Sequence, residues 1–216
     1  NGNYGGNIFL QDCNRFTIRN VEARNFNGDG ISFQICHDVH VEKCHIHGNQ
    51  GNGLHPGSGA QRPVMRGNLL ENNNIGLFWC WGVKHGLAEQ NRMKGNRSQG
   101  MSIGHNDTDN VMRDNEIVRS GKVGVLFRDD SRGLDFWANR NVLENNRVID
   151  SGDENGIAID IRGNTKDVLV AGNTIQENRG PGKRQGIHID KAVERLKLRE
   201  NVIEGFDKQI VDERRS

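Results

Sequence analysis

Apolar and polar residues alternate along short segments of this chain, and the alternation returns at a nearly constant interval. Each copy starts with a small residue, usually glycine, and places apolar side chains one and three positions later, as in Gly30-Ile-Ser-Phe-Gln34. A period of two residues predicts β-strands, because an amphipathic helix would repeat its apolar positions every 3.6 residues. Eight copies start at Asn7, Gly30, Gly53, Gly76, Gly100, Gly124, Gly156 and Gly186, and a weaker ninth copy starts at Gln209.

The interval between copies predicts the fold. Successive starts lie 23 or 24 residues apart, except for gaps of 32 residues after Gly124 and 30 residues after Gly156. A unit of this length holds three short strands and cannot bury its apolar face alone, so the units must stack. We therefore expect an all-β chain that forms one domain over residues 1–216, a single-stranded right-handed parallel β-helix of about eight to nine coils. The two longer gaps predict insertions near 129–138 and 179–185.

An asparagine recurs at one corner of the predicted coil. Asparagine tolerates the left-handed backbone of a tight corner, and its amide can hydrogen-bond the asparagine that is stacked one coil away. An apolar residue follows two positions later in most copies, which indicates a further short strand. The corner positions are Asn20, Cys44, Asn68, Asn91, Asn115, Asn146, Asn173 and Asn201.

Composition narrows the class of protein and of partner. The hydrophobic share is 33% and the chain holds 28 glycines and 3 prolines, which argues against a helical bundle. Lys and Arg total 29 while Asp and Glu total 28, so no global basic field favours nucleic acid. No apolar run approaches the roughly 18 residues of a membrane span. The chain lacks an initiating Met and begins partway into a coil, so we expect further residues to flank it in its source protein.

The outward positions of the first strand of each coil carry candidate catalytic groups. Alignment of the copies on their glycines places Asp160 and Asp190 in one column of adjacent coils, with their carboxylates about 5–6 Å apart. One carboxyl group could then hold a proton as general acid while its partner acts as base or nucleophile. Arg128 and His188 would supply a cation and a titratable neighbour. The alternative is that these charges simply lie on a solvated sheet face.

A second group combines aromatic and basic side chains and predicts a sugar subsite or the base region of a lyase. Trp79 belongs to the same stretch but falls at an inward position, so we expect it in the core. β-Elimination of a uronate needs a base for the proton beside the carboxylate and a cation that neutralises that group. Lys84, His105 or Arg128 could fill these roles. The candidate binding residues are His55, Gln34, Trp81, Lys84 and His105.

The predicted insertions add further candidates, because insertions in solenoids often mark the binding face. Phe136 and Trp137 could stack on a sugar ring. Lys183 and Arg184 could meet a carboxylate of the glycan, and Asp129 opens the first insertion. Ordinary surface turns are the alternative.

The sequence predicts no metal site and no cofactor. Calcium stays an alternative that no ligand pattern supports, and His105 with Asp107 or Asp109 is an alternative metal site that lacks convergent three-ligand spacing. Four histidines lie close together in sequence, but strand alternation and turns predict that they point from different faces. Cys13 and Cys36 occupy the same place in adjacent coils, which predicts stacked thiols or a disulfide. The four histidines are His37, His40, His45 and His47.

The whole chain resembles the right-handed parallel β-helix superfamily of pectate lyases, polygalacturonases, alginate lyases and mannuronan epimerases. The segment Asn52-Gly-Leu-His-Pro-Gly-Ser58 is similar to the Gly-His-Gly-Ile-Ser-Ile-Gly-Ser signature of polygalacturonases, and Asp29-Gly-Ile precedes it by one coil. The Asp-Asp pair and the Arg-Ile-Lys segment of that family are absent, Asn52 replaces its histidine, and the Asp-Pro-His-Asp motif of mannuronan epimerases is missing. The resemblance implies a polysaccharide or oligosaccharide partner and an extracellular or periplasmic location.

Two functions from different classes are consistent with these features. The first is an enzyme that cleaves glycosidic bonds, by hydrolysis with Asp160 and Asp190 ahead of β-elimination of a uronate glycan. The second is a non-catalytic β-helix, either a glycan-binding module or a structural part of a larger protein.

Overall fold

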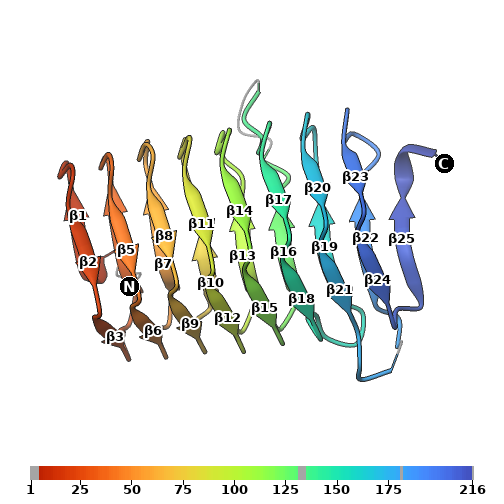
Figure 1. Cartoon of the computed structure of the whole chain (residues 1–216), viewed down its shortest axis with the longest axis horizontal. Coiled ribbons are helices and arrows are strands. Elements are labelled where there is room, and N and C mark those ends of the chain that lie inside the picture. Colours follow the sequence, from red (N-terminus) through yellow and green to blue (C-terminus); the bar gives the residue numbers. More distant parts are fainter. Residues whose placement is uncertain (1–4, 131–134, 181, 216) are drawn as a thin grey trace.

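Three parallel β-sheets run the length of the protein in a computed structural model that describes residues 5–130, 135–180 and 182–215 (Figure 1). Within these described ranges the first sheet holds nine strands and the other two hold eight each. The chain visits the sheets in turn, so each strand pairs with the equivalent strand of the next coil, and the solenoid predicted from the 23-residue interval is confirmed. No helix in the described part of the chain is long and apolar enough to cross a membrane.

The strands have the following bounds. The first sheet consists of β1 (Gly6–Gln11), β4 (Asp29–Gln34), β7 (Asn52–Gly57), β10 (Ile75–Phe78), β13 (Gln99–Ile103), β16 (Val123–Phe127), β19 (Ile157–Ile161), β22 (Gln185–Ile189) and β25 (Lys208–Asp212). The second consists of β2 (Thr17–Arg19), β5 (His40–Glu42), β8 (Val64–Arg66), β11 (Leu87–Glu89), β14 (Val111–Arg113), β17 (Val142–Glu144), β20 (Leu169–Ala171) and β23 (Lys197–Arg199). The third consists of β3 (Glu22–Arg24), β6 (His45–His47), β9 (Leu69–Glu71), β12 (Arg92–Lys94), β15 (Glu116–Val118), β18 (Arg147–Ile149), β21 (Thr174–Gln176) and β24 (Val202–Glu204), and a short 3-10 helix η1 (Glu213–Arg215) ends the described chain.

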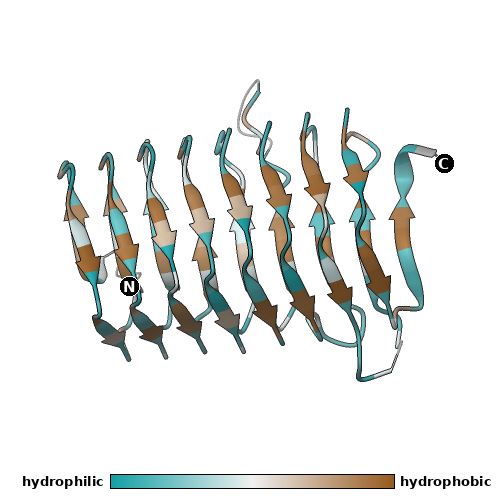
Figure 2. Ribbon diagram, in the orientation of Figure 1, coloured by the Kyte–Doolittle hydropathy of each residue, from teal (hydrophilic) through white to brown (hydrophobic). Residues whose placement is uncertain are grey.

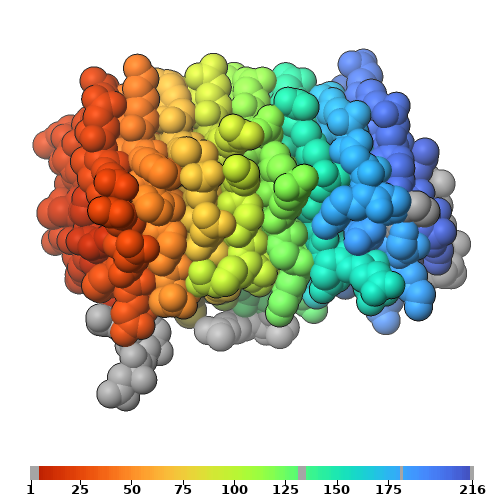
Figure 3. Space-filling model, turned by 90° about the horizontal axis from the view of Figure 1, so that it is seen from below, coloured from red at the N-terminus to blue at the C-terminus, as the bar shows by residue number. Residues whose placement is uncertain are grey.

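Apolar side chains fill the interior of the solenoid because each strand turns alternate residues inward. Figure 2 shows the apolar residues on the strands and mostly hydrophilic residues in the turns, and Figure 3 shows the coils as successive bands along the molecule. Trp79 is fully buried, as its inward position predicts. One column of the core consists of Ile31, Leu54, Leu77, Met101, Val125, Ile159 and Ile187, all with no exposed surface.

A ladder of asparagine side chains supports the corner between the second and third sheets. The Asn115 amide nitrogen donates to Oδ1 of Asn146 at 2.9 Å and to the carbonyl oxygen of Ala88 at 2.9 Å. The Asn91 side chain in turn donates to Oδ1 of Asn115 at 3.0 Å. The ladder continues without interruption from Asn68 to Asn201, which confirms the predicted stacking of the amides. The predicted left-handed backbone lies instead at the residue before the asparagine, such as Asp114 (φ 55°) and Asn145 (φ 54°). At an earlier corner, Cys13 and Cys36 stack without a disulfide, and the Cys13 backbone N–H approaches the Cys36 sulfur at 3.4 Å.

The register of the first sheet differs from the predicted register after the first insertion. Asp160 pairs with Leu126 on one side and with His188 on the other, so the predicted column of Asp160 and Asp190 is wrong. The position that is glycine in earlier coils is filled here by Ala158, and Gly156 lies in the turn before β19. A Cβ atom at the equivalent Gly124 would lie 2.5 Å from the Ala158 carbonyl oxygen, so this crowded column accepts only small residues. Alignment of the copies on glycine alone therefore places the coil of β19 two residues out of register with its neighbours.

Candidate functional site

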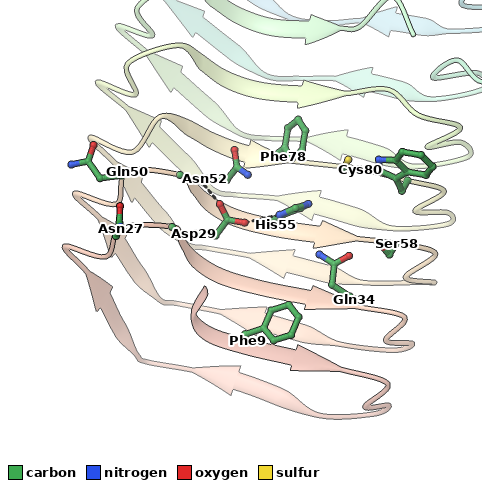
Figure 4. A pocket seen from close by; sticks show the side chains of 13 residues that line it. Phe9, Asn27, Asp29, Gln34, Gln50, Asn52, His55, Ser58, Phe78 and Cys80 are labelled. Carbon is green, nitrogen blue, oxygen red and sulfur yellow. Dashed lines mark hydrogen bonds and ion pairs between the residues drawn. The ribbon is translucent and has the colours of Figure 1, made fainter. Parts of the chain in front are cut away.

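A hollow of about 680 Å³ lies on the outer face of the first sheet, over the coils of β1 to β10 (Figure 4). It is called the sheet-face hollow below. Its lining residues come from successive coils, so a chain-like ligand that follows the solenoid axis would contact several coils at once. The lining residues are Phe9, Asn27, Gly28, Asp29, Gln34, Gln50, Gly51, Asn52, His55, Ser58, Phe78, Cys80 and Trp81.

A histidine and an aspartate form the polar centre of this hollow. His55 lies on β7 and its Nδ1 is 2.6 Å from Oδ2 of Asp29, at the start of β4 in the preceding coil. The backbone N–H of Asn52 donates to the other Asp29 oxygen at 2.7 Å, which fixes the carboxylate. When the neutral imidazole donates its Nδ1–H to this carboxylate, its lone pair lies on Nε2. No described residue forms a hydrogen bond with this Nε2.

Aromatic rings surround this centre. The His55 ring contacts Phe78 edge to face, with ring centroids 5.1 Å apart. Phe9 and Trp81 line the same hollow and are 43% and 47% exposed. Exposed aromatic faces around a polar centre are typical of surfaces that bind sugar rings, which present apolar C–H groups and hydroxyls together.

Arg128 follows β16 and reaches back over the sheet toward the sheet-face hollow. Its guanidinium carbon lies 4.5 Å from the centroid of the Phe78 ring, a cation–π distance. Two guanidinium nitrogens donate to Ser102 Oγ and to the Trp79 carbonyl oxygen, each at 2.8 Å. A Cβ atom at Gly104 would lie 2.8 Å from Nε of Arg128, so the absence of a side chain there makes room for the guanidinium.

A buried carboxyl group lies behind this arginine. Asp107 has no exposed surface and accepts hydrogen bonds from the backbone N–H groups of Val83 and Gly104, and one of its oxygens is 3.6 Å from Arg128. Burial raises the pKa of Asp107 to about 7, against the opposing effect of Arg128 and the backbone donors. Burial also lowers the pKa of Arg128, which nevertheless stays charged because a guanidinium does not deprotonate in proteins.

A second polar cluster adjoins the sheet-face hollow at Cys80. The Cys80 sulfur lies 3.2 Å from Nδ1 of His105, and Nε2 of His105 lies 2.6 Å from Oδ2 of Asp130. The Trp81 ring stacks on His105 at 5.4 Å, and Phe136 packs edge to face against both rings. The structure thus brings together five of the predicted residues along one stretch of the first sheet, namely Gln34, His55, Trp81, His105 and Arg128.

The predicted acid pair lies several coils away and has a different arrangement. Asp160 is fully buried, and its carboxylate accepts from Nε of Arg162 at 2.6 Å and lies 2.8 Å from Nδ1 of His188. Asp190 accepts instead from the backbone N–H of Gly163. The two carboxylates therefore do not face one another across a column. Asp160 is an ion-pair partner of Arg162, buried on the outer face of the first sheet.

The remaining predicted residues occupy separate places. Lys84 lies in a bridge that leads toward the second sheet. The indole N–H of Trp137 donates to Asp129 at 3.4 Å within the first insertion, of which residues 131–134 lie outside the described part. In the second insertion, where residue 181 is also outside the description, Arg184 donates to two backbone carbonyl oxygens and Lys183 is exposed.

Several site residues have no distinct signal in the sequence. Asp29 and Asp130 are single carboxylates that reach a histidine on another coil, and Phe9 and Phe78 are outward aromatic residues of the first strands. The sequence could have marked Phe9 and Phe78 as outward residues only through their column positions, because both alternate with inward apolar residues. The histidine prediction needs one correction. His45 and His47 lie on the same face of β6 with stacked rings, because residues two apart on a strand share a face.

Comparisons with known proteins agree with the architecture. A family model described as "Right handed beta helix region" matches residues 6–135. A search of curated proteins finds no match.

Solved structures of three other proteins share the fold. They are the periplasmic alginate epimerase AlgG (12% identity, TM-score 0.79, 92% of this chain and 47% of that chain), the Azotobacter vinelandii mannuronan C-5 epimerase AlgE4 A-module (16% identity, TM-score 0.73, 92% and 56%) and the Streptococcus pneumoniae surface protein and adhesin PfbA (11% identity, TM-score 0.75, 94% and 68%). The chain spans about half the length of the two epimerase chains. At these identities the likeness concerns the fold.

Proposed function

The chain belongs to the right-handed β-helix family, and we propose that it binds an acidic polysaccharide in the sheet-face hollow and cleaves it by β-elimination at a uronate sugar. The observation that carries this proposal is the hydrogen-bonded pair of His55 and Asp29 on the floor of an aromatic-lined hollow. Structural neighbours whose names include alginate epimerases support a uronate glycan as the ligand. A periplasmic protein and a surface protein among them support a location outside the cytoplasm.

The chemistry starts with a proton transfer to His55. Nε2 takes the proton from C5 of the uronate, next to the carboxylate, while Asp29 accepts the Nδ1–H bond and stabilises the imidazolium that forms. The electron pair of the broken C–H bond forms the C4–C5 double bond, and the glycosidic oxygen leaves C4. The imidazolium can return its proton to that oxygen, so the step consumes no other reactant.

Two amides flank the proposed base. Asn52 and Gln34 line the hollow beside His55, and their N–H groups can donate to the uronate carboxylate as negative charge develops on it. A Cβ atom at Gly57 would lie 2.6 Å from the Gln34 amide nitrogen, so glycine leaves room for this side chain.

Among the residues named in this site, Arg128 carries the guanidinium nearest to the pair of His55 and Asp29. It hydrogen-bonds residues in the coils of β10 and β13, which lie one and two coils beyond His55. At a spacing of about 4.8 Å between strands, these coils are about 5–10 Å from His55 along the solenoid axis. At that distance it binds the carboxylate of a neighbouring sugar better than that of the reacting one. A row of acidic sugars along the sheet therefore fits the charge distribution.

The test is incubation of the protein with alginate, pectin, ulvan, glycosaminoglycans and neutral glycans, reading both new reducing ends and the ultraviolet absorbance of unsaturated uronates. Both signals on an acidic glycan are the expected result. Reducing ends without the absorbance would overturn β-elimination in favour of hydrolysis. Binding without either signal would make the chain a glycan-binding module, the second function that the exposed Phe9 and Trp81 rings favour.

A further inference from the structure

The outer face of the third sheet carries a cluster of potential ligands near the start of the solenoid. β3 and β6 pair in parallel with Glu22 opposite His45, and β6 pairs with β9 with His47 opposite Glu71. The intervening residues Ala23, Ile46 and Leu70 point inward and are buried. The backbone beneath the cluster is therefore fixed both by the pairing of the strands and by the core.

Three side chains of this face converge. Nε2 of His47 lies 3.0 Å from Oε1 of Glu22, and the His45 and His47 rings stack with centroids 4.1 Å apart and planes inclined by 26°. One ligand atom from each of the three residues lies within 4.8 Å of the others. Donor atoms on a tetrahedral Zn²⁺ are about 3.4 Å apart at metal–ligand distances near 2.1 Å, so small side-chain rotations close the site.

We propose that Glu22, His45 and His47 bind a divalent transition-metal cation such as Zn²⁺ between the first two coils. Two imidazoles and one carboxylate form a donor set that suits Zn²⁺, Cu²⁺ or Ni²⁺, whereas Ca²⁺ and Mg²⁺ prefer an all-oxygen site. The site lies on the third sheet and does not involve the sheet-face hollow of the first sheet.

One cation already lies beside the cluster. Arg24 lies 3.5 Å from Glu22 and competes with the metal for one of its oxygens.

Glu71 orients the site from the next coil. Its Oε2 lies 3.0 Å from Nε2 of His45. When His45 binds the metal through Nδ1, the Nε2–H can keep this bond, and a carboxylate in that place fixes the tautomer and raises the basicity of a metal-bound imidazole. The bound metal would link β3 to β6 and hold the first coil on the second, which stabilises the folded chain by mass action.

The experiment uses the untagged chain after treatment with a chelator. We expect isothermal titration with ZnCl₂ to give one site per chain, thermal unfolding to shift upward with Zn²⁺, and Co²⁺ to give a visible ligand-field spectrum. His45→Gln and His47→Gln should each weaken Zn²⁺ binding at least tenfold and abolish the spectrum, and Glu71→Gln should weaken it about tenfold. The matched control is His40→Gln on β5, which removes a partly exposed histidine beside a glutamate without a second imidazole.

Three results would overturn the site. They are the absence of saturable Zn²⁺ binding, unchanged binding in the double variant His45→Gln/His47→Gln, and an equal loss in His40→Gln. The substituted side chains point outward, and circular dichroism and unfolding without metal establish that each variant is folded. Titration with Ca²⁺ should give no site, and equal binding of Ca²⁺ and Zn²⁺ would contradict the imidazole ligands.

Discussion

Nδ1 of His55 lies 2.6 Å from Oδ2 of Asp29, although the two residues belong to successive coils of the solenoid. Stacking of the coils therefore sets the tautomer of the imidazole. The carboxylate is itself held by the backbone N–H of Asn52, the first residue of the strand that carries His55. A base oriented by a carboxylate that the backbone fixes needs no rearrangement before it accepts a proton.

Removal of this base should abolish chemistry and leave binding intact. We expect His55→Gln to lower turnover of the acidic glycan by about 100-fold or more, because positioned acid–base groups contribute at least that much. Affinity should change less than about threefold, since aromatic contacts and Arg128 remain. Turnover is measured from unsaturated uronate absorbance and affinity by titration calorimetry.

Asp29→Asn tests the orienting role in the same assays, and it should lower turnover less than His55→Gln does. His40→Gln, on the second sheet, serves as the control and should behave as the unmodified chain. Full turnover in His55→Gln would remove His55 from the mechanism.

The charge of Arg128 should decide the preference for acidic over neutral glycans. Arg128→Gln removes charge-assisted hydrogen bonds worth about 1.5–3 kcal/mol, so the dissociation constant for an acidic oligosaccharide should rise about 10- to 100-fold. Binding of a neutral oligosaccharide should stay the same, and the salt dependence of acidic-glycan binding should weaken. Arg128→Lys should retain part of the affinity because the charge is kept.

Gly104→Ala reaches the same guanidinium without changing any charge. Its Cβ would lie 2.8 Å from Nε of Arg128 and displace the side chain, so this variant should also lose acidic-glycan affinity. Gly5→Ala is the control, because a Cβ there meets nothing within 4 Å. Retained affinity in Gly104→Ala would show that the observed guanidinium position is not the binding position.

The sequence predicts the solenoid well because its period is a property of local patterning. Alternation and the recurrent asparagine depend on neighbours within one coil and on the same place in the next coil. The prediction that Asp160 and Asp190 form an acid pair is wrong because a two-residue shift at Ala158 changes which outward residues share a column. The pairing of His55 with Asp29 crosses coils diagonally, and no local pattern encodes which of several carboxylates a histidine reaches. His45 and His47 could have been placed together from strand alternation alone.

The asparagine ladder should contribute strongly to stability at each step. Asn115→Ala leaves the backbone N–H and the side-chain amide of Asn91 without their buried acceptor, as well as the carbonyl of Ala88 without this donor. We expect a loss of about 3 kcal/mol in the free energy of unfolding. Denaturation in urea measures it, and Asn155→Ala, at an exposed position, should change stability by less than about 0.5 kcal/mol. Equal effects of the two substitutions would contradict the role of the ladder.

His188 should make stability depend on pH near neutrality. Burial of its ring lowers the pKa, but hydrogen bonds to Asp160 and Glu213 outweigh burial, so the net pKa lies above the usual 6.5. The folded chain then binds this proton more tightly than the unfolded chain does. The stabilisation is fully present below about pH 6.5 and is lost as pH rises through the higher folded pKa.

The comparison of wild type with His188→Gln isolates this group. The wild type should exceed the variant in melting temperature by the largest margin near pH 6, and the margin should shrink steadily toward about pH 9. Arg162 still neutralises the buried Asp160 carboxylate in the variant, so the chain should remain folded for the measurement. A margin that is constant over this range would mean that His188 stabilises the coil by packing, because only a contact that depends on the imidazolium proton can vanish with rising pH.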